Sequence, residues 1–70
     1  MNPQSAITVN GTPQPLAHPI PLEQLLQVLG LAGKPVVVEL NEQPVFPRNY
    51  AGTTVEPGAR REIVTHAAGG

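Results

Sequence analysis

The last two residues of the sequence, Gly69 and Gly70, are the residues best suited to chemistry. A Gly-Gly end carries an α-carboxylate next to two α-carbons without side chains, and glycine adopts backbone conformations closed to other residues. Such an end can pass through a narrow tunnel and present its carboxylate to an activating enzyme. We therefore interpret it as a site where chemistry is performed on this protein. Many chains end in glycine-rich segments, so the rest of the sequence has to support this interpretation.

Other candidate chemical groups are few. Cysteine is absent, which excludes a disulfide framework, a thiolate nucleophile and a Cys-based metal site. Sulfur carried by this protein could therefore not be held as a persulfide, and the chain end would be the reasonable place for it. His18 and His66 lie far apart with no acidic or Cys cluster nearby, so we predict solvated loop histidines and no metal site. Glu39 and Glu62 alternate with apolar positions, which favours solvent-facing residues over an acid–base pair.

Composition narrows the classes of protein further. With 70 residues and 40% hydrophobic residues, the chain can form one small domain. It has one Phe, one Tyr and no Trp, so the core must consist of Leu, Val, Ile and Ala. A net charge of −1 gives no electrostatic footprint for nucleic acid or an anionic membrane. No apolar run approaches the ~20 residues of a membrane span, and no signal peptide is recognisable, so we expect a cytoplasmic protein.

The first elements that must position the chain end are a hairpin and a helix. Residues 5–9 alternate as in a half-buried strand, and Asn10-Gly11 is a strong hairpin signal. The return segment 12–16 holds two prolines and can only be an edge strand. An apolar stripe with helical spacing follows, with Pro21 at the first helical position and Gly30 just past the end. The stripe consists of Leu22, Leu25, Leu26 and Leu29.

The second half of the sequence reads as further strands. Residues 36–40 are β-branched and apolar, which predicts a central strand, followed by a turn over residues 41–44. Val45-Phe46 is predicted as a short edge strand, and we favour Phe46 as a filler of the core or the sheet edge over an interface anchor. Residues 48–52 are predicted to be irregular, and Arg48 and Tyr50 there are either partner contacts or loop anchors.

The last elements lead to the chain end. Residues 53–55 approach the turn Glu56-Pro57-Gly58, whose Pro-Gly pair fits a type II turn. The last strand is predicted over residues 61–65, with Arg60-Arg61 as a solvated pair at its start. The remaining residues, 66–70, are predicted to be a flexible tail that reaches roughly 17 Å when fully extended.

This order of elements predicts an α+β fold. A hairpin, a crossover helix and further strands suit a small mixed sheet with one helix on one face. This is the β-grasp arrangement that ubiquitin also uses. We therefore predict a β-grasp domain over residues 1–65 and a tail over residues 66–70.

In detail the sequence resembles the ThiS family, the small sulfur carriers of thiamine-thiazole biosynthesis. The resemblance covers residues 5–70. The sequence departs from the family pattern at three positions: at Ala59, where Asp is common, at Arg61, where an apolar residue is usual, and at Ala68, where a third glycine is frequent. It depends on the ordered set of segments Val9-Asn10-Gly11, Leu25-Leu26 to Leu31, Val36 to Asn41, Pro47-Arg48, Pro57 to Val64 and Gly69-Gly70.

The resemblance implies that this protein is a substrate with no catalytic residues of its own. An adenylating enzyme of the ubiquitin-activating type (ThiF-like) would adenylate Gly70, and a persulfide enzyme would deliver sulfur to give a thiocarboxylate. A thiazole synthase (ThiG-like) would accept that sulfur. ATP and Mg²⁺ would be bound by the activating enzyme, because no phosphate-binding loop occurs here. The residues expected to contact these partners are Arg48, Arg61, His66, Ala67 and Ala68.

Three alternatives stay open. The small subunit of molybdopterin synthase also ends in a Gly-Gly thiocarboxylate, but it is typically longer. A ubiquitin-like modifier would be joined through Gly70 to target lysines, and Lys34 is the only lysine for self-attachment. The third alternative is a β-grasp binding module whose Gly-Gly end has no function.

Overall fold

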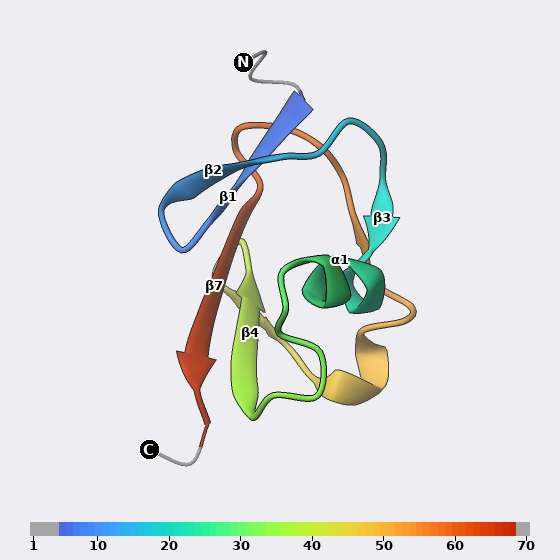
Figure 1. Cartoon of the computed structure of the whole chain (residues 1–70), viewed down its shortest axis with the longest axis vertical. Helices are drawn as coiled ribbons and strands as arrows, with labels where there is room; N and C mark the ends of the chain where they lie inside the picture. The colour runs from blue at the N-terminus through green and yellow to red at the C-terminus, as the bar shows by residue number, and fades with distance from the viewer. Residues whose placement is uncertain (1–4, 69–70) are drawn as a thin grey trace.

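The computed structural model describes residues 5–68 and contains a five-stranded mixed sheet with one helix on one face (Figure 1). The strand order is β2-β1-β7-β4-β5. The strands β3 and β6 form a second, two-stranded sheet beside the helix. The predicted β-grasp arrangement is confirmed. The elements are β1 (Ala6–Val9), β2 (Thr12–Pro15), β3 (Ile20–Pro21), α1 (Leu22–Val28), β4 (Val36–Leu40), β5 (Gln43–Val45), a 3-10 helix η2 (Pro47–Asn49), β6 (Thr54–Val55) and β7 (Glu62–Ala67).

The first hairpin forms where the sequence predicts it. Val9 lies opposite Thr12, and the two turn residues have positive φ, 50° at Asn10 and 82° at Gly11. Asparagine and glycine tolerate this conformation, and such turns match the right-handed twist of the strands. The proline-containing strand β2 lies at the edge of the sheet, as predicted.

The centre of the sheet is β7, which lies between β1 and β4. It runs parallel to β1, with Val9 opposite Ile63, and antiparallel to β4, with Val38 opposite Thr65. The strand predicted as central, β4, is also an interior strand, because β5 covers its other edge.

Helix α1 begins one residue later than predicted. Pro21 is the N-cap and belongs to β3, and no side chain caps the helix. Instead, the Leu22 N–H donates to the Thr53 carbonyl at 2.7 Å and the Glu23 N–H to the Tyr50 carbonyl at 3.2 Å. These carbonyls satisfy N–H groups that a helix start leaves without partners. Gly30, with φ of 76°, follows the helix end as predicted.

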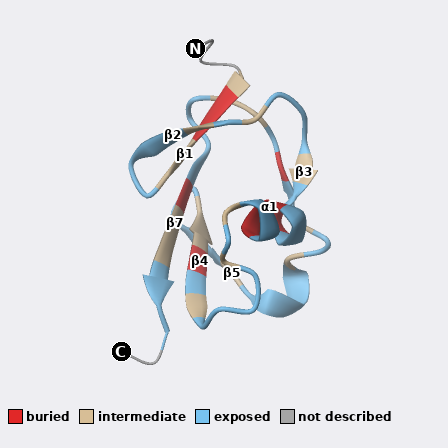
Figure 2. Ribbon diagram, viewed as in Figure 1, coloured by how far each residue is buried: buried red, intermediate tan, exposed pale blue. Residues whose placement is uncertain are grey.

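The core lies between α1 and one face of the sheet (Figure 2). Three of the four leucines of the predicted stripe are buried, and Leu29 packs against them while half-buried. Aliphatic side chains make up the core, as the composition requires. The buried cluster consists of Ile7, Leu22, Leu25, Leu26, Val38, Val55 and Ile63.

The segment after β4 differs from the prediction. The turn comprises only Asn41 and Glu42, with φ of 48° and 69°, so β5 begins at Gln43 and contains Pro44. The segment predicted to be irregular begins with the 3-10 helix η2. Pro47 begins η2, and the fixed φ of proline is compatible with the first turn of a helix.

The turn before β7 docks on β1. The Gly58 N–H donates to the Ala6 carbonyl at 2.9 Å, and the Arg61 N–H donates to the Gly58 carbonyl at 3.0 Å. Gly58 has φ of 150°, far from the value near 80° of a type II turn. The turn is where the sequence predicts it, but the type II geometry is wrong because the backbone adapts to β1.

The last strand continues past its predicted end. It runs to Ala67, with His66 opposite Val37 and Ala67 opposite Val36 of β4. The prediction that the tail begins at His66 is therefore wrong, because β4 is long enough to pair with two more residues. Gly69 and Gly70 lie outside the described residues. Across residues 5–68, no helix is long and apolar enough to cross a membrane.

Candidate functional site at the C-terminal end of β7

Asn10 holds the middle of β7 on the side of β1. Its backbone N–H donates to the Ile63 carbonyl at 2.8 Å. Its side-chain oxygen accepts from the Thr65 N–H at 2.9 Å, and its Nδ2 donates to the Thr65 Oγ1 at 3.0 Å. The Asn10 side chain thus makes the hydrogen bonds to β7 that the backbone would make if β1 continued past Val9. As a result, β7 is held on this edge as far as Thr65.

Asn41 holds the start of β7 on the side of β4. Its N–H donates to the Glu62 carbonyl at 2.8 Å, and its Oδ1 accepts from the Glu62 N–H at 2.7 Å. Both asparagines occupy positive-φ turn positions, where this residue type is tolerated. The sequence predicted both turns from these residues but gave no sign that their side chains reach across to β7.

Beyond Thr65, the described part of β7 pairs with β4 alone. The last register pair with β1 joins Val9 and Ile63, whereas pairing with β4 continues to Val36 and Ala67. The Ala68 N–H then donates to the Pro35 carbonyl at 2.8 Å. Residues 66–68 are therefore held at one edge only, immediately before Gly69.

Side chains alternate along β7, and Ile63 is buried against the helix, so His66 lies on the opposite face of the sheet. Its Nε2 lies 3.3 Å from the Glu39 carboxylate, and the two side chains are 57% and 35% exposed. His66 is solvent-exposed as predicted, but the prediction that it lies in a loop is wrong, because it belongs to β7 and contacts Glu39. An exposed pair of this kind contributes little stability, since solvent screens it. Its consequence is local: it orients the imidazole beside Val37, which is 44% exposed.

The two glutamates do not form a pair. Glu39 contacts His66, and Glu62 is exposed at the other end of β7, opposite Thr8. Within residues 5–68 no hydrogen bond or ion pair joins the two carboxylates, in keeping with the predicted solvent-facing positions.

The residues predicted as partner contacts fall into separate places. His66, Ala67 and Ala68 are exposed and consecutive at the end of β7. Arg61 is exposed just before the start of β7, a strand length away. Arg48 lies in η2, where its guanidinium carbon is 5.1 Å from the centre of the Phe46 ring. The structure therefore brings together three of the five.

Phe46 and Tyr50 have different roles from one another. Phe46 is 52% exposed beneath Arg48, so it does not fill the core, the first of the two places predicted for it; it directly follows the edge strand β5. Tyr50 is half-buried and packs against the core cluster, and its carbonyl accepts from the start of α1. It is therefore a loop anchor, one of the two roles that the sequence left open.

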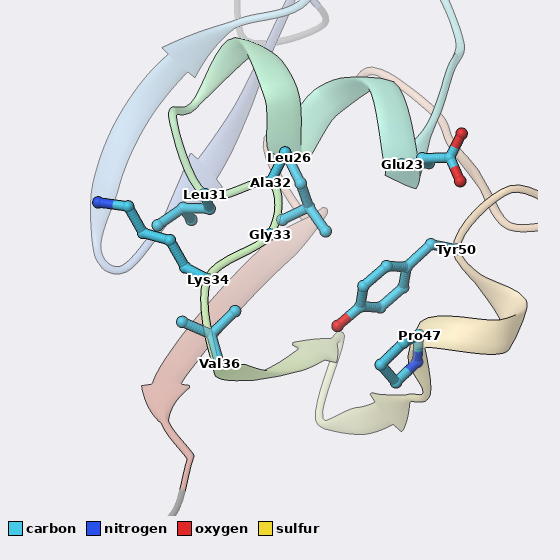
Figure 3. Close-up of a pocket in the computed structure, with 9 residues that line it drawn as sticks. All are labelled: Glu23, Leu26, Leu31, Ala32, Gly33, Lys34, Val36, Pro47 and Tyr50. Atoms are coloured by element: carbon cyan, nitrogen blue, oxygen red, sulfur yellow. The ribbon is translucent and has the colours of Figure 1, made fainter.

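Tyr50 also lines a cavity of about 360 Å³ on the helix side of the sheet (Figure 3). In Figure 3 the Lys34 ammonium and the Glu23 carboxylate point outward at opposite sides of it. The cavity is apolar over most of its lining, and among its described lining residues we find no cluster of catalytic or metal-binding side chains. It is lined by Glu23, Leu26, Leu31, Ala32, Gly33, Lys34, Val36, Pro47 and Tyr50.

Comparison with known proteins agrees with this fold. The model of the ThiS family matches residues 7–70, which includes both asparagine turns and the whole of β7. The chain belongs to the ThiS family. The crystal structure of a thiamine biosynthesis protein (ThiS) from Geobacter metallireducens is similar, with a TM-score of 0.80 and 29% sequence identity. The match covers 93% of this chain and 96% of that one. No curated protein sequence matches the chain significantly.

Proposed function

We propose that this ThiS-family protein is a sulfur carrier for thiamine biosynthesis, and that it carries sulfur as a thiocarboxylate on Gly70. The observation that carries the proposal is the family match, which extends through Gly69 and Gly70. The name of the similar Geobacter protein supports the pathway. The described fold adds that its central strand leads directly to these two residues.

The proposed chemistry takes place in partner enzymes. A carboxylate is a poor electrophile, so an adenylating enzyme of the ThiF type first joins Gly70 to AMP and releases pyrophosphate from ATP. The terminal sulfur of an enzyme persulfide then attacks the acyl carbon and displaces AMP. Cleavage of the resulting acyl disulfide by a second thiol leaves the Gly70 thiocarboxylate. A ThiG-like thiazole synthase then accepts the sulfur. ATP and Mg²⁺ are bound by the activating enzyme, and this chain supplies the carboxylate.

The end of β7 limits the reach of this carboxylate. Two residues extend at most about 7 Å beyond Ala68, whereas residues 66–70 together extend roughly 17 Å. Pairing of residues 66–68 with β4 therefore shortens the segment that can enter a buried active site. A long reach requires these residues to separate from β4.

Partner contacts are proposed on the exposed residues at the end of β7. His66, Ala67 and Ala68 precede the reactive end, and two of them have small side chains that fit a narrow entrance. Arg48 and Arg61 are exposed at other places on the surface, and we propose them as contacts farther from the reactive end.

Intact mass spectrometry tests the proposal. After incubation with ATP, Mg²⁺, the activating enzyme and a sulfur donor, the protein should gain the mass difference between one sulfur and one oxygen atom. Deletion of Gly70, or addition of one residue after it, should abolish this gain while leaving the denaturant unfolding curve unchanged. A variant in the turn before the start of β7, Ala59→Asp, serves as the matched control and should load normally.

Other outcomes would contradict the proposal in distinct ways. Loading that persists without Gly70 would remove the chain end from the mechanism. Covalent adducts of the size of target proteins would indicate a ubiquitin-like modifier. No mass change, with a known carrier loading in the same assay, would indicate a binding module.

A further inference from the structure

The ladder between β4 and β7 has a defect at its last pair. In antiparallel strands, every second opposed pair exchanges two backbone hydrogen bonds. The Asn41 N–H donates to the Glu62 carbonyl, and the Ala68 N–H donates to the Pro35 carbonyl, so both pairs belong to this hydrogen-bonded set. The register places Glu39 opposite Val64 and Val37 opposite His66 in the same set. The pair of Pro35 and Ala68 is therefore the last of the series within residues 5–68.

Pro35 can make only one of the two bonds of its pair. Its carbonyl accepts from Ala68, but proline has no N–H to donate to the Ala68 carbonyl. The adjacent N–H groups are used within the preceding loop: the Lys34 N–H donates to Leu31 at 3.1 Å, and the Val36 N–H donates to Lys34 at 2.9 Å. In the part of the chain that the structure describes, the final pair of the ladder thus has one hydrogen bond of the two.

If the C-terminal end of β7 separates from β4, the separation should not extend past Thr65. From Ala68 back to His66, β7 separates from one neighbour only, whereas Thr65 is also held by two hydrogen bonds to the Asn10 side chain. The segment that can separate without disturbing the body is therefore residues 66–68. These are the residues whose release extends the reach of the chain end.

We propose that Pro35 is a positioning residue that keeps residues 66–68 ready to separate from β4, so that the chain end reaches into the activating enzyme. The missing N–H shifts the equilibrium at the end of β7 toward the open form. The second half of this proposal, the effect on activation, rests on the proposed function. The first half, the opening equilibrium, concerns this chain alone.

The variant Pro35→Ala restores the missing donor and should close the end of β7. One hydrogen bond corresponds to a shift of roughly two- to ten-fold in the opening equilibrium. The Ala68 amide should exchange its hydrogen more slowly by that factor in NMR-detected exchange. Because the activating enzyme binds only the open form, the KM for the carrier should rise by a similar factor while kcat stays unchanged.

Pro44→Ala is the matched control. Pro44 lies in β5 opposite Glu39 and has no register contact with β7. The variant Pro44→Ala makes the same chemical change in an exposed strand. It therefore reproduces the change in unfolded-chain entropy that loss of a proline causes, but adds no hydrogen bond to β7. It should leave both the Ala68 exchange rate and the KM as they are. Pro35→Val serves as a second variant with a donor, should alanine at this position disturb the loop.

Each result decides one half of the proposal. Unchanged or faster exchange at Ala68 in both donor variants would show that Pro35 does not set the opening of β7. Slower exchange with an unchanged KM would show that opening does not limit activation. If the wild-type protein is not adenylated at all, the proposed function fails, and the exchange measurement still tests the role of Pro35 in the strand.

Discussion

The two halves of β7 differ in how they are held, although they form one continuous strand. Residues 62–65 are held on both sides, by β1 as far as Ile63 and by the Asn10 side chain at Thr65, and on the other side by Asn41 and β4. Residues 66–68 are exposed and are paired on one side only, with β4 and with Pro35 just before it. The first half carries the fold, and the second half leads to the proposed reactive end. Stability and accessibility are thus separated within a few residues, because one neighbouring strand ends before the other.

The largest effect should come from the core of the first half. Ile63 is fully buried, so Ile63→Ala should lower the free energy of unfolding by about 2–5 kcal/mol. The cost includes the cavity left in a core too small to rearrange around it. Urea titration measures it. A loss of only a few tenths would show that β7 does not anchor the core, and the contrast between its halves would disappear.

An intermediate effect should come from the asparagine that marks the boundary. Asn10→Gly keeps a residue that tolerates the positive φ but removes both side-chain bonds to Thr65. We expect a loss of about 1–2 kcal/mol in unfolding free energy, and faster amide exchange at Thr65. Asn41→Gly, which removes one side-chain bond, is the matched comparison and should cost less. Equal exchange at Thr65 in wild type and Asn10→Gly would contradict the boundary.

The smallest effect on stability should come from the second half. His66→Ala removes an exposed contact with Glu39, so the free energy of unfolding should change by no more than about 0.5 kcal/mol. As a proposed partner contact, His66 should instead affect the KM for the activating enzyme. Thermal unfolding and loading kinetics on the same sample separate the two effects. A large loss of stability together with an unchanged KM would reverse the roles assigned to the two halves.

Much of the fold could be predicted from local patterns. Alternation identified β1, β-branched apolar residues identified β4, and the leucine spacing identified α1. Asn10-Gly11 identified the first hairpin, and most of β7 was also predicted. These signals depend on neighbours in the sequence, where burial and backbone preference act directly. The two-residue strands β3 and β6 were missed as a pair, because two residues hold too little periodicity to be recognised.

Only part of the candidate site could be predicted, because only part of it depends on local patterns. The Gly-Gly end and its resemblance to ThiS are visible in the sequence, but the pairing of His66 with Glu39 and the exposure of Phe46 are not. Both depend on which strand lies beside which. The antiparallel pairing of β4 with β7 joins residues far apart in the sequence, and no local pattern encodes it.

The sequence alone determined the composition of the core, the identity of most elements and the candidate reactive group at Gly70. Only the tertiary structure decided that β7 lies at the centre, that Asn10 and Asn41 hold it, and that Pro35 stands opposite Ala68. The physical reason is register. A proline is known to lack a donor wherever it occurs, but which carbonyl is left without a partner depends on how distant strands align.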